Sequence, residues 1–134
     1  MEDMKINVKI KLSALWVTVM LCYLYGDVFG FFEPGIIEEI IAGAPRGIQI
    51  TQVSLLGIAI LMAIPSVMVF LSLTLKPKAN RWANIILGIL YSLVMLGTML
   101  MPGAWAYYIF LGIVEIVLTL LITWYAWKWP KQEA

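Results

Sequence analysis

Four long apolar segments, separated by short polar loops, constrain what this chain can fold into. The segments extend over residues 12–32, 48–75, 82–101 and 105–127. A helix of about 20 apolar residues suffices to cross a bilayer. Because lipid offers no hydrogen bonds, a spanning segment must satisfy its own backbone, as a helix does. The sequence therefore predicts an all-α fold, a four-helix transmembrane bundle, in which residues 1–134 form a single integral membrane domain.

Composition agrees with this interpretation and excludes several functions. Of the 134 residues, 63% are hydrophobic and 13% are charged, whereas a soluble domain has about 25% charged residues. The net charge of +1 provides no field to attract nucleic acid. Histidine is absent and Cys22 is the single cysteine, which removes the commonest metal ligand and any disulfide within the chain. We expect no enzyme, no catalytic residue, no metal, no cofactor and no nucleic-acid partner.

The basic residues predict how the chain is oriented in the membrane. Lysine and arginine near span ends are held on the cytoplasmic side. With four spans, the two termini and the second loop share one side and hold eight basic residues, while the other side has only Arg46. We expect a plasma-membrane protein with both termini in the cytoplasm. The first apolar run also exceeds the core of a secretory signal, about 7–15 residues, so we expect it to be retained.

The first external loop, residues 33–47, has a helical pattern of its own. Isoleucines recur at helical spacing within residues 36–41, which predicts a short interfacial helix with its apolar face in lipid. Three acids and one basic residue lie in this loop, namely Glu33, Glu38, Glu39 and Arg46. This acidic lip is either a solvated face, which we favour, or a mouth that attracts cations.

Two acidic residues inside the apolar segments are the strongest functional candidates. Glu115 lies near the middle of the fourth segment, where a charged carboxylate costs at least about 2.5–3.5 kcal/mol and should face protein or trapped water. It is interpreted either as a protonated acid that donates a hydrogen bond between helices or as a group that binds a proton, cation or substrate. Asp27 lies nearer the outer end of the first segment, where local solvation and a functional site are both consistent with the pattern.

Polar residues at helical spacing extend this pattern to the other segments. We expect Tyr91, near mid-membrane, to be the hydroxyl partner of Glu115, and Gln52 to lie near Asp27 toward the outside. Together they predict a polar pocket that is open outward. The candidate residues for substrate or ion binding are Glu115, Asp27, Tyr91, Gln52, Tyr23 and Tyr108.

The second and third segments carry further expectations. Pro65 cannot donate a backbone hydrogen bond, which frees the carbonyl of Leu61, and the hydroxyl of Ser66 could help to satisfy the backbone nearby. Arg81 and Asn84 are expected at the inner interface, reaching lipid phosphates rather than forming a gate. The inward stripe of the second segment is expected to be Gln49, Gln52, Ala59, Ala63 and Ser66.

Five short motifs carry a resemblance to a known group of proteins. They are Lys11-Leu12-Ser13-Ala14-Leu15-Trp16, Tyr25-Gly26-Asp27, Leu61-Met62-Ala63-Ile64-Pro65-Ser66, Asn80-Arg81-Trp82-Ala83-Asn84 and Trp124-Tyr125-Ala126-Trp127. Together they resemble an uncharacterised family of small bacterial four-span membrane proteins, a domain-of-unknown-function family. The resemblance covers nearly the whole chain and implies a shared fold, but it implies no activity.

Two functions stay open at this point. The first is a protein that binds or transports a small solute or ion through a polar intramembrane site. Four short helices leave little room for a permeation path, so this function implies a homo-oligomer. The second is a non-transporting interaction or assembly protein beside a larger membrane partner, in which the buried polar residues are structural. In both cases the lipid bilayer surrounds the protein. The sequence does not identify a ligand.

Overall fold

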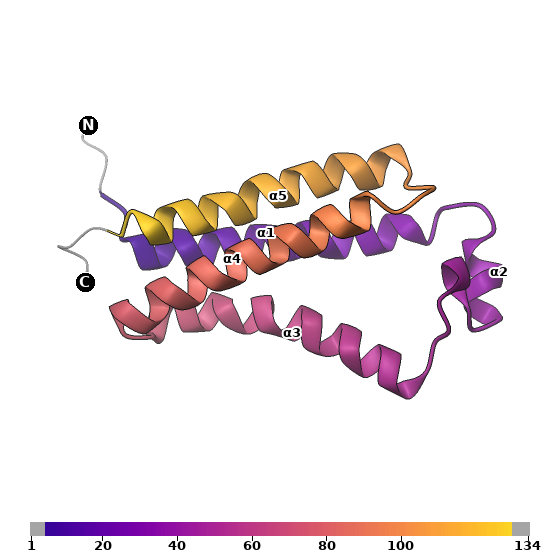
Figure 1. Cartoon of the computed structure of the whole chain (residues 1–134), viewed down its shortest axis with the longest axis horizontal. Coiled ribbons are helices and arrows are strands. Elements are labelled where there is room, and N and C mark those ends of the chain that lie inside the picture. The colour runs from indigo at the N-terminus through magenta and orange to yellow at the C-terminus, as the bar shows by residue number, and fades with distance from the viewer. Residues whose placement is uncertain (1–4, 130–134) are drawn as a thin grey trace.

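Four long helices run along one another in the computed structural model, which describes residues 5–129 (Figure 1). They are α1 (Val8–Gly30), α3 (Gln52–Thr74), α4 (Pro77–Met99) and α5 (Ala106–Trp127). Each has 22 or 23 residues and is apolar enough to cross a membrane. At about 1.5 Å per residue, these helices are about 33–35 Å long, slightly more than a hydrocarbon core of about 30 Å. The predicted all-α four-helix bundle is confirmed.

The helix ends differ from the predicted segments mainly at α4. This helix begins at Pro77, five residues before the predicted start at residue 82. Proline suits the first turn of a helix because its missing N–H would have no partner there. The polar residues Asn80 and Arg81 made this turn resemble a loop, although they belong to the helix. At the other end of the chain, α1 begins after Asn7, whose side chain accepts a hydrogen bond from the backbone N–H of Lys9 at 2.8 Å.

The two ends of the bundle are distinct. The start of α1, the end of α5 and the α3–α4 connection lie together at one end, here named the α3–α4 end (Figure 1). The short helix α2 (Ile36–Ile41) and the α4–α5 turn lie at the opposite end, the α2 end. This arrangement agrees with four passes of the chain through one layer. The predicted short helix in the first loop is also confirmed.

The first loop is tied to the bundle through Glu33. The side chain of Glu33 is only 10% exposed and forms an ion pair with Arg46 and a hydrogen bond with the hydroxyl of Tyr107. Partial burial lowers the pKa of the Arg46 guanidinium, but Tyr107 and Glu33 together raise it above its ordinary value, so the guanidinium stays charged. One acid of the predicted acidic lip is therefore neutralised by the single basic residue of the loop.

A buried hydrogen-bond network joins α1, α3 and α4 near the α3–α4 end. Trp16 Nε1 donates to Asn84 Oδ1 at 2.7 Å, and Asn84 Nδ2 donates to Asn80 Oδ1 at 2.6 Å. Asn80 Nδ2 in turn donates to the carbonyl of Ser72 at 2.7 Å. All four residues of this asparagine network, Trp16, Ser72, Asn80 and Asn84, are fully buried. The expectation that Asn84 reaches lipid phosphates is therefore wrong.

Arg81 closes the end of α5. Its Nε donates to the carbonyl of Ala126 at 3.1 Å and its Nη2 to the carbonyl of Trp127 at 3.2 Å. The last carbonyls of a helix lack partners within the helix, and a basic side chain there satisfies them. The guanidinium also lies 5.5 Å from the ring centroid of Trp127. Arg81 thus binds two helices together, a role that the expectation of phosphate contact missed.

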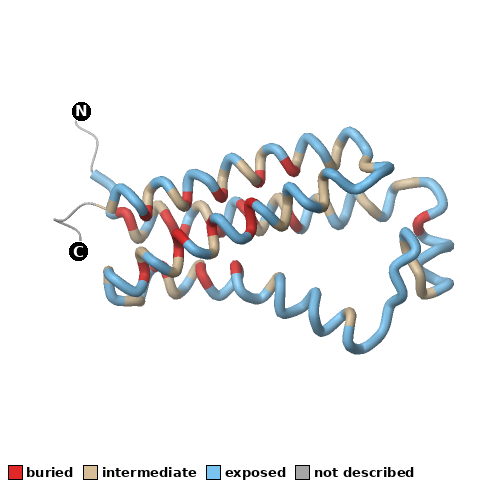
Figure 2. Tube along the Cα trace, in the orientation of Figure 1, coloured by how far each residue is buried: buried red, intermediate tan, exposed pale blue. Residues whose placement is uncertain are grey.

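The buried face of α3 differs from the predicted stripe. Pro65, Met68 and Ser72 are buried, whereas Ala59, Ala63 and Ser66 are exposed. Figure 2 shows that the half of α3 nearer the α2 end is exposed almost throughout. The helix packs mainly against α1 and touches α4 at few positions. Two hydrogen bonds hold this face of α3 against its neighbours. The carbonyl of Ser72 accepts from Asn80, and the carbonyl of Val69 accepts from the Ser13 hydroxyl.

Helices α4 and α5 are in close contact at Gly88. A Cβ added there would lie 2.3 Å from Thr123 Oγ1 and 2.9 Å from the backbone oxygen of Thr119. One turn further along, the hydroxyls of Ser92 and Thr119 form a hydrogen bond of 2.6 Å. Small residues allow membrane helices to pack backbone against backbone, where dispersion and such hydrogen bonds hold them.

We predict that Gly88→Ala destabilises the bundle by about 1–3 kcal/mol, because its methyl group would overlap a backbone oxygen that cannot rotate away. The matched control is Gly97→Ala on the same helix, where an added Cβ has no neighbour within 4 Å. Unfolding in mixed micelles, followed by circular dichroism, compares the two. Equal stability of the two variants would contradict the packing described.

We predict that Asn84→Ala lowers the free energy of unfolding by about 1–3 kcal/mol, since it leaves the buried indole N–H of Trp16 without its acceptor. Thr18→Ala is the control, because the Thr18 hydroxyl bonds only to the Ala14 carbonyl of its own helix and is exposed. Adding Trp16→Phe should cost much less in the Asn84→Ala background than alone. Strictly additive costs in this double-mutant cycle would show that the two side chains are not coupled.

Candidate functional site

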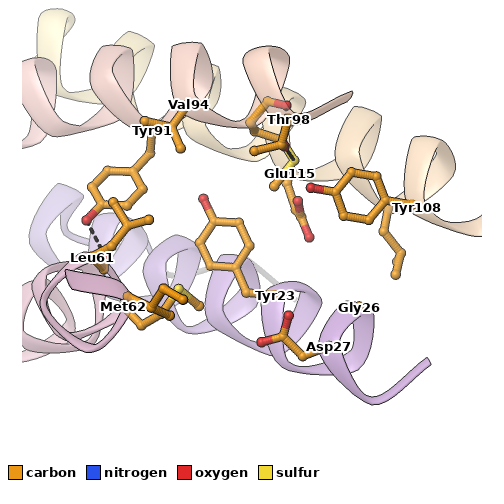
Figure 3. Close-up of a pocket in the computed structure, with 13 residues that line it drawn as sticks. Tyr23, Gly26, Asp27, Leu61, Met62, Tyr91, Val94, Thr98, Tyr108 and Glu115 are labelled. Carbon is orange, nitrogen blue, oxygen red and sulfur yellow. Dashed lines mark hydrogen bonds between the residues drawn. The ribbon is translucent and has the colours of Figure 1, made fainter. Parts of the chain in front are cut away.

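A cavity of about 160 Å³ lies between the four long helices, on the α2 side of the asparagine network. Each long helix contributes to its wall (Figure 3). Five of the six candidate residues line it, namely Glu115, Asp27, Tyr91, Tyr23 and Tyr108. Tyr23 and Asp27 share one face of α1, and Tyr108 and Glu115 share one face of α5. The packing of the helices brings these faces together with Tyr91 of α4.

The sixth candidate, Gln52, does not line the cavity. It is the first residue of α3 and is exposed, in the half of that helix that diverges from the bundle. The cavity wall from α3 is formed instead by Ile58, Leu61 and Met62. The pairing of Gln52 with Asp27 assumed that α3 stays parallel to its neighbours, and the structure does not place Gln52 there.

Glu115 is the most deeply buried acid at this site. Its residue is 3% exposed, and its carboxyl group points into the cavity, where the hydroxyls of Tyr23 and Tyr108 also point (Figure 3). The backbone carbonyl of Glu115 accepts a hydrogen bond from the side chain of Thr119, whose Oγ1 lies 3.0 Å away. The carboxyl group itself has no hydrogen-bond or ion-pair partner among residues 5–129. The carboxyl group therefore faces the cavity without a protein partner from these residues.

Tyr91 has a different partner from the one expected. Its hydroxyl donates to the carbonyl of Leu61 at 2.5 Å rather than to Glu115. Pro65 lies four residues after Leu61 and leaves exactly that carbonyl without a backbone donor. The Ser66 hydroxyl bonds to the Met62 carbonyl at 2.8 Å, so it does not serve Leu61. The freed carbonyl was predicted correctly, and its partner comes from a neighbouring helix.

Asp27 occupies a more open position than Glu115. It lines the cavity from α1, one helical turn beyond Tyr23, and is itself exposed. Figure 3 shows its carboxylate on the same side of α1 as the tyrosine ring. The cavity thus has one buried and one accessible acid. It contains no lysine or arginine from the described residues.

Cofactor and metal binding find no support in the donor set at this site. In the described part of the chain, no group of three or more histidine, cysteine, aspartate or glutamate side chains is close enough to hold a metal ion. The remaining wall is mostly aliphatic, thioether and tyrosine side chains. This arrangement can hold a small polar or charged ligand against an apolar wall.

The fold and the cavity define a small multi-pass membrane protein with four helices long and apolar enough to cross the membrane. The chain belongs to a family of unknown function, DUF6326, whose model matches residues 2–134. No curated protein and no solved structure matches the chain. The family assignment confirms the resemblance drawn from the sequence motifs, and it carries no activity.

The hydrogen bond between Tyr91 and Leu61 can be tested by comparing variants with and without Pro65. Tyr91→Phe should cost about 1–3 kcal/mol of stability, because a carbonyl within an apolar helix loses its donor. In a Pro65→Ala background the new alanine N–H can bond to Leu61, so the same substitution should cost much less. A double-mutant cycle measured by unfolding in micelles compares the two costs. Equal costs in both backgrounds would refute the assignment of this bond.

Proposed function

We propose that the chain binds, and transports, a small solute or ion in the cavity beside Glu115. The observation that carries this proposal is the Glu115 carboxyl group, 97% buried by residue, facing a cavity of about 160 Å³ without a partner among residues 5–129. Buried polar groups in native proteins are nearly always hydrogen-bonded. The Glu115 carboxyl oxygens instead border the cavity, where a ligand could bond to them.

The contrast with the asparagine network supports this interpretation. Asn80, Asn84 and Ser72 are equally buried, yet each has hydrogen-bond partners from the protein itself. Interhelical adhesion explains those side chains completely. It does not explain Glu115, whose placement in a membrane helix costs at least about 2.5–3.5 kcal/mol when charged. A ligand that bonds to the carboxyl group would offset this cost.

Orientation, location and assembly complete the proposal. The eight basic residues that share one side, against the single Arg46 on the other, support cytoplasmic termini. The resemblance of the motifs to small bacterial membrane proteins favours the bacterial inner membrane. In that orientation the cavity lies toward the external half. Four helices enclose little space, so transport would require a homo-oligomer. Catalysis is not part of the proposal.

The decisive experiment compares wild type and Glu115→Gln after reconstitution into liposomes. Flux of protons, sodium, potassium and small organic solutes should fall by about tenfold or more in the variant, because a neutral amide cannot replace the charge. Glu38→Gln is the matched control, since Glu38 lies on α2 in the first loop and outside the cavity lining. It should transport as wild type does.

Binding and flux that are both unchanged in Glu115→Gln would overturn the proposal. A variant that loses only folding yield, together with a stoichiometric partner recovered from native membranes, would favour the non-transporting assembly protein instead. Binding that depends on Glu115 without any flux would retain the binding site and remove the transport function.

A further inference from the structure

We propose that the ligand of this cavity is a small organic ammonium cation with an apolar body, which enters from the bilayer between α3 and α4. This inference rests on the proposed function and names its class of ligand. It follows from three properties of the described cavity: the charge of its wall, its size and its opening.

The wall selects a positive charge. Glu115 and Asp27 line the cavity, and the described residues contribute no basic side chain to it. An anion would meet two acids in a medium of low dielectric constant, where like charges repel most strongly. A neutral ligand could bond to Glu115 but would gain nothing from the two carboxyl groups together. An ammonium group can donate hydrogen bonds to a carboxylate while balancing its charge.

Size and composition favour an organic cation over a metal ion. A cavity of about 150 Å³ in another protein admits benzene, and this one has about 160 Å³. Sodium, magnesium or calcium would need a shell of oxygen ligands, about six for the divalent ions, whereas Leu61, Met62 and Val94 present only apolar side chains here. The hydroxyls of Tyr23 and Tyr108 point into the cavity beside Glu115 and can accept further hydrogen bonds from an ammonium group.

The α3 wall of the cavity is also exposed on the outside of the bundle. Ile58 and Leu61 line the cavity, yet they are 49% and 36% exposed on a helix that crosses the membrane. The half of α3 that contains them diverges from α4, as Figures 1 and 2 show. Side chains of α3 therefore line the cavity and also lie on the surface that would face the acyl chains, which favours entry between α3 and α4. An amine with an apolar body partitions into the bilayer interface and reaches this opening directly.

The test uses benzylammonium, which combines one ammonium group with a benzene-sized body. Its matched probes are benzyl alcohol, which is neutral, and benzoate, which is an anion of similar shape. Isothermal titration of the protein in lipid nanodiscs at neutral pH, with protein-free nanodiscs subtracted, measures each. We expect saturable binding of benzylammonium that is about tenfold or more tighter than that of benzyl alcohol, and none of benzoate.

Variants link the binding to the site. Glu115→Gln should remove the preference for benzylammonium over benzyl alcohol, while Glu115→Asp should retain it with weaker binding because the charge is kept. Glu38→Gln, outside the cavity, should bind as wild type does. Val94→Trp, which keeps both acids and fills the cavity, should abolish binding of every probe and serves as a second variant if Glu115→Gln does not fold.

The outcomes separate this inference from the function on which it rests. Equal binding of benzyl alcohol and benzylammonium, unaffected by Glu115→Gln, would overturn the ammonium assignment and leave an apolar solute site. Potassium or sodium that binds alone and displaces benzylammonium through Glu115 would overturn it in favour of a metal-ion site. Absence of benzylammonium binding while liposome flux still depends on Glu115 would also overturn this inference alone. Loss of both signals would remove the proposed function as well.

Discussion

The carbonyl of Leu61 is the point at which α3 is joined to the rest of the bundle beside the cavity. Pro65 removes its backbone donor, and no water is available in a bilayer to replace it. The Tyr91 hydroxyl supplies the missing hydrogen bond from α4, where α3 otherwise makes few contacts. The Tyr91 ring packs edge-on against Trp16, with centroids 6.2 Å apart. The carbonyl that Pro65 frees thereby connects α3 to the core beside the cavity and sets one boundary of the cavity.

On either side of this bond the bundle has different chemistry. Toward the α3–α4 end, buried amides and hydroxyls bond to one another, and Arg81 closes the end of α5. Toward the α2 end, α3 diverges, and Glu115 faces a cavity without a partner among the described residues. Satisfied polar groups hold the helices together, while an unsatisfied one can bind something else. The first half therefore has a structural role, and the proposed ligand site lies in the second.

Sequence reasoning succeeded where local spacing decides the outcome. Glu115 and Tyr108 are seven residues apart on one helix, and Tyr23 and Asp27 are four apart on another, so each pair shares a face whatever surrounds it. It failed for α3, where small residues were taken as the buried face. Ala59 and Ala63 can face lipid at no cost, so their type carries no information about direction. Asn80 was missed because it lies in a polar turn that resembled a loop.

The sequence by itself determined that four helices are long and apolar enough to cross the membrane, where each one lies in the chain, and that Glu115 must avoid lipid. These properties follow from hydrophobicity and backbone hydrogen bonding, which act within a segment. Only the tertiary structure decided that Tyr91 bonds to Leu61, that Asn84 is buried with Trp16, and that α3 leaves Gln52 outside the cavity. Those outcomes depend on the rotation and tilt of each helix against its neighbours. Lipid and helix interiors are similarly apolar, so specific polar contacts and close packing set that geometry.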